Sequence, residues 1–203
     1  MSKVCEYYFA PQSPWCYLGH QRLVDLAKKY AIKIDVKPVD LGKVFTISGG
    51  LPLAKRAPQR QAYRLVEMQR WSDELKLPMH MQPTFFPVSG DPASSMIIAA
   101  QLAHGSEAAL NLTGAIMRAI WAEQKNIADA DTLSGLAFDC ELDGKLLLKS
   151  AETASVQAEY DRFTNEMIAA NGFGVPWFVY QGENYWGQDR LDFLEKAFQS
   201  NSN

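Results

Sequence analysis

The fold of this chain is decided by residues 4–23, which read VCEYYFAPQSPWCYLGHQRL. Residues 4–9 are rich in aromatic and β-forming side chains and predict a buried strand. A proline-containing stretch then ends that strand. From residue 15 to residue 30 apolar side chains recur at helical spacing. This predicts a helix with Ser13 as its N-cap and Pro14 at its first position.

A second strand and a long helical region follow. Residues 32–39 alternate between apolar and charged side chains, as a half-exposed strand does. Strand, helix and strand in this order predict a parallel βαβ unit. No strand alternation appears from Asp40 to about residue 165. This region instead contains helical patterns at about 58–77, 93–104, 107–124, 130–140 and 152–171, a loop at 49–52 and a proline-rich segment at 78–92.

Strand signals return near the C-terminus. The sequence predicts a strand at 174–180, a turn at 181–184, a short strand at 185–186 and a closing helix at 189–198. The complete order, βαβ, helices, then ββα, resembles a thioredoxin fold interrupted by an all-α block. We therefore predict an α/β chain with a discontinuous thioredoxin-like domain, residues 1–42 and 166–203, and an inserted all-α domain, residues 43–165.

Composition and charge exclude several classes of function. The 203-residue chain is 21% charged with a net charge of −3, so a nucleic-acid partner is not expected. The sequence shows neither a signal peptide nor an apolar run long enough to span a bilayer. Three widely spaced cysteines, Cys5, Cys16 and Cys140, argue against a disulfide framework and favour a cytoplasmic location. Neither the cysteines nor the three scattered histidines have metal-ligand spacing, so we expect no metal.

Residues 13–16 read SPWC, one cysteine short of the C-x-x-C motif of thiol redox proteins. At a strand-to-helix turn, backbone N–H groups and the helix dipole stabilise an anion. The Ser13 hydroxyl cannot attack a disulfide, but it can donate a hydrogen bond to a thiolate that belongs to another molecule. The alternative is that Ser13 only caps the helix. We expect Cys16, one turn further on, to be a buried small hydrophobic residue.

Two further motifs lie near the C-terminus. The sequence GVP at 174–176 brings a proline to the start of a strand, where its peptide bond is trans in most proteins and cis in a minority. The sequence WGQDR at 186–190 combines a glycine, which permits close backbone approach, with an acidic helix N-terminus. Such a turn can hold a zwitterionic amino-acid end, like the γ-glutamyl part of glutathione. A capped helix with an internal ion pair is the alternative.

Together these motifs carry a resemblance to a known family. SPWCYLG at 13–19, GVPWF at 174–178 and YWGQDRL at 185–191 resemble the 2-hydroxychromene-2-carboxylate isomerases. These are bacterial relatives of kappa-class glutathione transferases on a DsbA-like thioredoxin scaffold. The resemblance implies a cytoplasmic, homodimeric enzyme of aromatic hydrocarbon breakdown. With glutathione as cofactor, such an enzyme interconverts 2-hydroxychromene-2-carboxylate and trans-o-hydroxybenzylidenepyruvate.

The resemblance also implies residue roles. Ser13 matches the catalytic serine that stabilises the glutathione thiolate. Val175, before a cis bond to Pro176, matches the residue whose backbone pairs with the cysteinyl part of glutathione. The residues matching those that hold the γ-glutamyl end are Trp186, Gly187, Gln188 and Asp189.

The substrate side departs from the family pattern. The family tends to place a lysine just after the second strand, a polar pair in the next loop and an aromatic residue in the proline-rich segment. The corresponding candidates for substrate binding are Phe45 (with Lys43 nearby), Lys55 with Arg56, and Phe85. Positive charge for a substrate carboxylate is available from Lys43, Lys55, Arg56 or Arg60.

Other functions fit the same motifs. The chain can be a kappa-class-like glutathione transferase acting on another electrophile. It can also be a disulfide oxidoreductase that works through Cys16 alone, or a glutathione-binding domain without catalysis.

Overall fold

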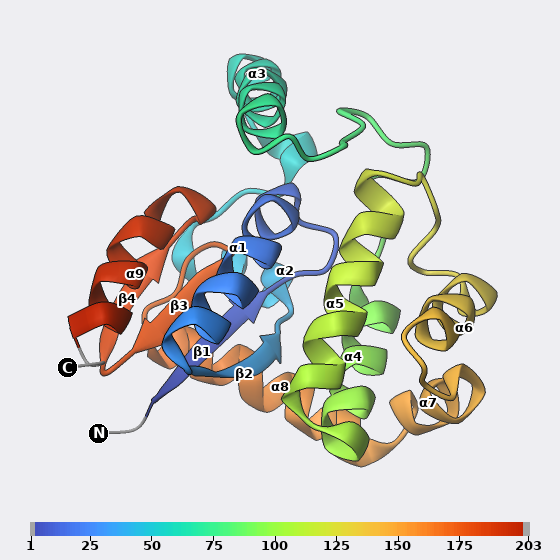
Figure 1. Cartoon of the computed structure of the whole chain (residues 1–203). Helices are drawn as coiled ribbons and strands as arrows, with labels where there is room; N and C mark the ends of the chain where they lie inside the picture. Colours follow the sequence, from blue (N-terminus) through green and yellow to red (C-terminus); the bar gives the residue numbers. More distant parts are fainter. Residues whose placement is uncertain (1–2, 201–203) are drawn as a thin grey trace.

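The computed structural model describes residues 3–200, and its centre is a four-stranded sheet with the order β2-β1-β3-β4. The strands are β1 (Val4–Phe9), β2 (Lys33–Pro38), β3 (Trp177–Tyr180) and β4 (Glu183–Trp186). β1 is parallel to β2 and antiparallel to β3, and β3 is antiparallel to β4. Segments from the two ends of the chain thus lie side by side in one sheet (Figure 1).

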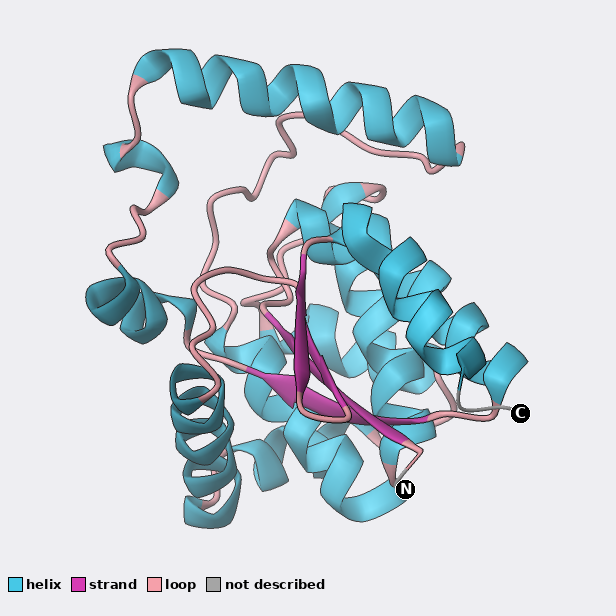
Figure 2. Ribbon diagram, turned by 90° about the vertical axis from the view of Figure 1, so that its left-hand side faces the viewer, coloured by secondary structure: helices cyan, strands magenta, loops and turns pink. Residues whose placement is uncertain are grey.

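Helices cover both faces of the sheet and form a block beside it (Figures 1 and 2). They are α1 (Pro14–Tyr30), α2 (Leu41–Ser48), α3 (Pro58–Leu75), α4 (Asp91–His104), α5 (Ser106–Trp121), α6 (Ala130–Asp139), α7 (Gly144–Ala151), α8 (Ala154–Ala169) and α9 (Leu191–Ser200), with short 3₁₀ helices η1 (Leu53–Lys55) and η2 (Gln188–Arg190). α1 and α9 lie together on one face, and α8 covers the other. Within residues 3–200, no helix has both the length and the apolar character that crossing a bilayer requires.

Buried aromatic rings hold β1 in the centre of the molecule. The Tyr7 ring stacks on Phe9 of the same strand and on Phe178 of β3, with centroid distances of 4.6 and 5.4 Å. Because helices cover both faces of the sheet, the second half of β1 is buried on both sides and reads as a continuous apolar run. This packing fixes the end of β1, from which the chain turns through Ser13 into α1.

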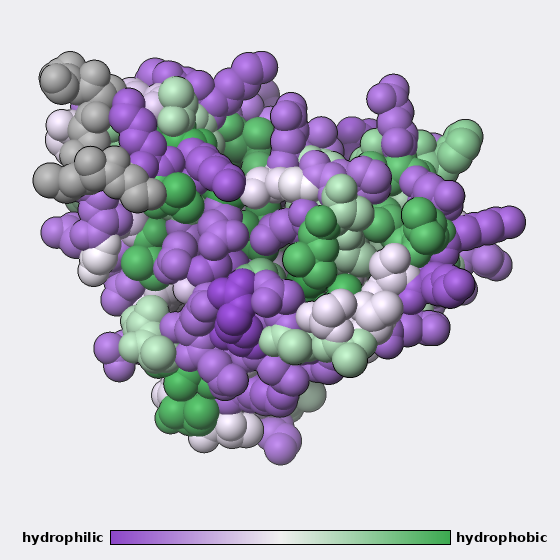
Figure 3. All heavy atoms as spheres, turned by 90° about the horizontal axis from the view of Figure 1, so that it is seen from below, coloured by the Kyte–Doolittle hydropathy of each residue, from purple (hydrophilic) through white to green (hydrophobic). Residues whose placement is uncertain are grey.

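Helix α3 stands apart from the rest of the chain. It lies across the top of the molecule in Figure 2, and Met68 and Ser72 are its buried residues. The face of the molecule opposite α3 is largely hydrophilic, with small apolar patches (Figure 3). α3 therefore forms a separate wall above the N-terminal end of α1, which it contacts.

The structure contains two helices that the sequence patterns do not predict, α2 and α7. Each has eight residues, and few of them are buried, so neither shows a long apolar stripe. The division into two domains stays a proposal, and its boundary at residue 165 falls within α8. Residues 1, 2 and 201–203, which belong to the predicted thioredoxin-like domain, lie outside the described residues.

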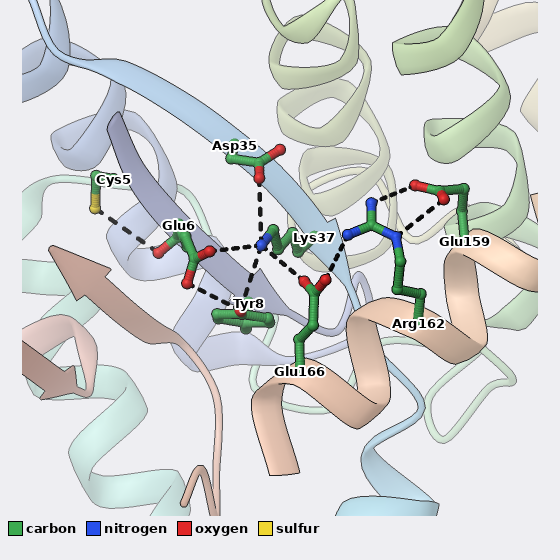
Figure 4. A network of polar contacts seen from close by, with 8 residues as sticks. All are labelled: Cys5, Glu6, Tyr8, Asp35, Lys37, Glu159, Arg162 and Glu166. Carbon is green, nitrogen blue, oxygen red and sulfur yellow. Dashed lines mark hydrogen bonds and ion pairs between the residues drawn. The ribbon is translucent and has the colours of Figure 1, made fainter. Parts of the chain in front are cut away.

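A buried lysine joins the sheet to α8 (Figure 4). The Lys37 side chain is 3% exposed, and its Nζ lies 2.7 Å from Glu6 of β1, 3.2 Å from Asp35 of β2 and 2.8 Å from Glu166 of α8. Burial alone would lower the pKa of Lys37, but hydrogen bonds to Glu166 and Glu6 outweigh it and hold the pKa above its ordinary value. Lys37 is therefore a charged cross-link between three elements.

Candidate functional site

Ser13 is the N-cap of α1, as the sequence predicts. Its backbone is extended, and its Oγ accepts a hydrogen bond from the Cys16 N–H at 3.4 Å. Pro14 occupies the first helical position, where its missing N–H costs no hydrogen bond. The hydroxyl thus lies at the positive end of a 17-residue helix, which is a favourable position for a negatively charged partner.

Cys16 is buried within the first turn of α1. It has no exposed surface. Burial raises the pKa of its thiol to about 12, against the smaller opposing effects of hydrogen bonds with Ser13 and Ala10. At neutral pH the sulfur is therefore a buried, protonated thiol. A reactive cysteine needs both thiolate character and access, and Cys16 has neither. This confirms the prediction of a buried small residue and counts against redox chemistry at Cys16.

The Val175–Pro176 turn lies beside this helix end. Its peptide bond is cis, as the resemblance implies. The Pro176 carbonyl accepts a hydrogen bond of 2.9 Å from the Gly187 N–H. That bond holds the turn before β3 against the segment that follows β4.

The segment from Trp186 to Arg190 is shaped by Gly187. The φ and ψ angles of Gly187 are 92° and 150°, a region that is essentially restricted to glycine. A Cβ atom at this position would lie 2.5 Å from Asp189 Oδ1. Asp189 forms an ion pair with Arg190. This is the internal pair that the alternative interpretation expects.

The side chain of Gln188 points into the molecule. The residue is 2% exposed, and its side-chain oxygen and its carbonyl accept hydrogen bonds from Arg22 of α1 at 3.0 and 3.1 Å. The side chain of Gln188 therefore anchors η2 on α1.

A cleft of about 610 Å³ separates α3 from these segments. One wall consists of residues from α3 and the turn before it: Arg56, Gln59, Arg60, Tyr63, Arg64, Glu67 and Trp71. The other wall consists of Trp15, Val175 and residues 186–190. Of the sequence-predicted site residues, the cleft brings together Arg56, Val175, Trp186, Gly187, Gln188 and Asp189.

The other predicted site residues do not line the cleft. Ser13 (9% exposed) and Pro176 lie behind the lining, next to Trp15 and Val175 in sequence. Phe45 lies under Arg56, whose guanidinium carbon is 6.0 Å from the centre of its ring. Lys55 and Phe85 are exposed to solvent away from the lining. Lys43 is 2.7 Å from Asp161 on α8, so its charge is already paired.

Sequence reasoning missed Trp15, Tyr63, Arg64 and Trp71 as cleft residues. Arg64 and Trp71 share a sequence signal. They belong to the set 60, 64, 67 and 71, which recurs at helical spacing and lies on one side of α3. That spacing is visible in the sequence, but the position of α3 relative to η2 is not. The aromatic residue that reaches this wall is Phe86 rather than Phe85, because the Phe86 ring packs against Arg64.

The fold and the site define a class of protein. The family model of the DSBA-like thioredoxin domain matches residues 4–199, and the chain belongs to this family. The predicted thioredoxin-like fold with helices added to it is thereby confirmed.

Among its relatives, a 2-hydroxychromene-2-carboxylate isomerase of Sphingobium xenophagum is 27% identical over 196 residues, 96% of this chain and 97% of that protein. A solved structure of a 2-hydroxychromene-2-carboxylate isomerase matches with a TM-score of 0.83 and 24% identity, over 97% of this chain and 95% of the other. Glutathione S-transferase kappa 1 of Rattus norvegicus is 22% identical over 95% of this chain and 89% of its own length. These are the relatives that the motifs indicate.

Proposed function

We propose that this chain is a glutathione-dependent isomerase that interconverts 2-hydroxychromene-2-carboxylate and trans-o-hydroxybenzylidenepyruvate. The observation that carries the proposal is Ser13, a hydroxyl at the N-terminus of α1 in the position where a C-x-x-C motif has its first cysteine. Near-full-length similarity to curated isomerases of this name supports the reaction. Similarity to a kappa glutathione transferase supports the cofactor.

The residues around the cleft fit glutathione in two respects. Gly187 has no Cβ, and its backbone conformation leaves the start of η2 open to an extended amino-acid end. The N-terminus of α1 favours a negatively charged sulfur close to Ser13. Ser13 would hold the sulfur, Val175 the cysteinyl backbone, and the backbone from Trp186 to Asp189 the γ-glutamyl end.

Each of these residues has a definite task in the reaction. When bound, glutathione supplies a thiol whose reversible addition turns a double bond into a single bond and so permits rotation. Ser13 donates a hydrogen bond at the sulfur and favours its ionised form. The helix N-terminus adds a favourable field. The aromatic residues of the cleft, Trp15, Tyr63, Trp71 and Trp186, orient a planar substrate.

Isomerisation measured with and without glutathione tests the proposal. We expect turnover of 2-hydroxychromene-2-carboxylate that requires glutathione and persists in Cys16→Ser. Turnover without glutathione would contradict it, and so would glutathione-dependent disulfide reduction that disappears in Cys16→Ser.

A conjugating transferase is the second candidate, and the kappa-class relative favours it. Product analysis separates the two reactions, because an isomerase returns glutathione unchanged whereas a transferase consumes it. We also propose that the protein acts as a cytoplasmic homodimer in aromatic hydrocarbon breakdown, with its cysteines free, as Cys5, Cys16 and Cys140 are here.

Gly187→Ala tests the proposed γ-glutamyl contact. We expect a loss of about 1–3 kcal/mol in stability from the strained backbone. We also expect weaker glutathione binding, because the new Cβ displaces Asp189. The control is Gly182→Ala, which has a similar φ of +83° but no neighbour within 4 Å of its Cβ. Calorimetric titration should show normal glutathione affinity for the control, and equal affinities for both variants would exclude the contact.

A further inference from the structure

The cleft wall formed by α3 contains positive charge without a carboxylate partner. Within residues 3–200, no aspartate or glutamate forms an ion pair with Arg56, Arg60 or Arg64. The acidic residues of the cleft are already paired, Glu67 with Arg70 and Asp189 with Arg190. Unpaired like charges that lie together repel one another, and an anion between them relieves the repulsion.

Arg64 differs from the other two arginines in its surroundings. Its guanidinium carbon lies 5.2 Å from the centre of the Phe86 ring and 5.8 Å from that of Trp121, and the two rings are 4.9 Å apart. The guanidinium therefore lies within cation–π distance of both rings. Burial, together with the charge of Arg56, lowers the pKa of Arg64 to about 10, so the group stays charged at neutral pH. The side chain is half-buried, whereas Arg60 is exposed.

The edge of the Arg64 guanidinium is available for binding. Within residues 3–200, its N–H groups have no hydrogen-bond acceptor, whereas Arg56 donates from Nε to the Leu51 carbonyl at 2.8 Å. Arg64 lines the cleft, and the planar fork of N–H groups of a guanidinium suits a carboxylate bound through both oxygens. Tyr63 and Trp71, which line the cleft on the same helix, offer an apolar surface to the conjugated part of such a molecule.

We infer that Arg64 binds the carboxylate of a conjugated 2-oxo acid substrate and so determines specificity in this chain. The inference rests on the proposed function. It adds a residue that binds the substrate carboxylate, because Phe45 occupies the position where the family has a lysine. Lys43, the nearest lysine, does not line the cleft and forms an ion pair with Asp161 instead.

Binding of 4-phenyl-2-oxobut-3-enoate and of its methyl ester tests the inference without turnover. Quenching of the cleft tryptophans, Trp15, Trp71 and Trp186, reports binding of both probes. We expect the wild type to bind the acid at least about tenfold more tightly than the ester. Arg64→Met should remove this preference by weakening acid binding and leaving ester binding unchanged. Arg64→Lys should keep part of it.

The control is Arg118→Met, which removes an exposed charge that is paired with Glu123 and does not line the cleft. It should keep the full preference. If Arg64→Met fails to melt cooperatively, Arg64→Gln, which keeps N–H donors without charge, replaces it and should also lose the preference. A folded Arg64→Met or Arg64→Gln variant that still prefers the acid overturns the inference.

Glutathione affinity, measured in parallel by calorimetry, separates this inference from the proposed function. Arg64→Met should bind glutathione as the wild type does. If the wild type binds no glutathione, the proposed function fails, while the comparison of acid and ester still decides the role of Arg64. If Arg64→Met loses glutathione binding and keeps its preference for the acid, the carboxylate assignment is wrong.

Discussion

Ser13→Ala should lower kcat/KM for glutathione-dependent isomerisation by about 100-fold or more. The variant loses the hydroxyl that we propose as the hydrogen-bond donor to the sulfur. The fold should persist, since an N-cap serine contributes about 1 kcal/mol and the bond it accepts from Cys16 is long, at 3.4 Å. Steady-state kinetics with glutathione at saturation measures the effect.

Asp143→Ala is the matched control for Ser13→Ala. Asp143 caps α7 by accepting a hydrogen bond of 3.0 Å from the Leu146 N–H, far from the cleft. Its loss should cost a similar amount of stability and no activity. If Ser13→Ala kept the kcat/KM of Asp143→Ala, Ser13 would be a helix cap and nothing more.

Lys37→Met should lower the free energy of unfolding by about 3 kcal/mol. The substitution keeps much of the buried stem but leaves Glu6, Asp35 and Glu166 without their shared cation. The effect lies at the low end for a broken buried pair, because these carboxylates are about one-third exposed and can turn towards water. For a chain of this size the melting temperature should fall by about 6–12 °C.

The loss should depend on pH with a definite sign. Burial alone raises the pKa of Glu166, but Lys37 and, to a smaller extent, Arg162 outweigh it and keep the pKa below its ordinary value of 4.5. The stability that ionised Glu166 contributes to the folded state is complete above pH 4.5. It is lost as the pH falls through the lower pKa that Glu166 has in the folded state. The wild type and Lys37→Met should therefore converge in stability in acid.

Lys43→Met is the control for Lys37→Met. It breaks an ion pair of 2.7 Å between α2 and α8 whose partners are 56% and 43% exposed. Such a pair contributes less than about 1 kcal/mol. Urea unfolding of both variants compares the two, and an equal loss would show that Lys37 is no stronger a cross-link than a surface pair.

The sequence predicts the thioredoxin-like part well because its signals are local. The apolar run of β1 and the N-cap of α1 each specify one structure from adjacent residues, and the hairpin of β3 and β4 is predicted with a turn that extends two residues into β4. α7 is missed for a physical reason. It begins with Gly144, where any Cβ would collide with Ser134 of α6, so tertiary packing has selected a residue that disfavours helix.

The same distinction holds for the site. Ser13, Val175 and Gly187 belong to motifs whose spacing along the chain indicates their positions. Arg64 has no such motif, because its environment comes from Phe86 and Trp121, which folding brings to α3 from other parts of the chain. Sequence patterns therefore predict the part of the site proposed for the cofactor better than the part proposed for the substrate.

Titration of the glutathione thiol in the bound state tests the central claim most directly. The ultraviolet absorbance of the thiolate, followed against pH, gives the thiol pKa in complexes with the wild type and with Ser13→Ala. We predict a pKa below about 7.5 in the wild-type complex and a higher value with Ser13→Ala, closer to the roughly 8.5 of an ordinary free thiol, because only the helix N-terminus then stabilises the sulfur. Equal pKa values in the two complexes would contradict the role of Ser13 as the group that stabilises the sulfur.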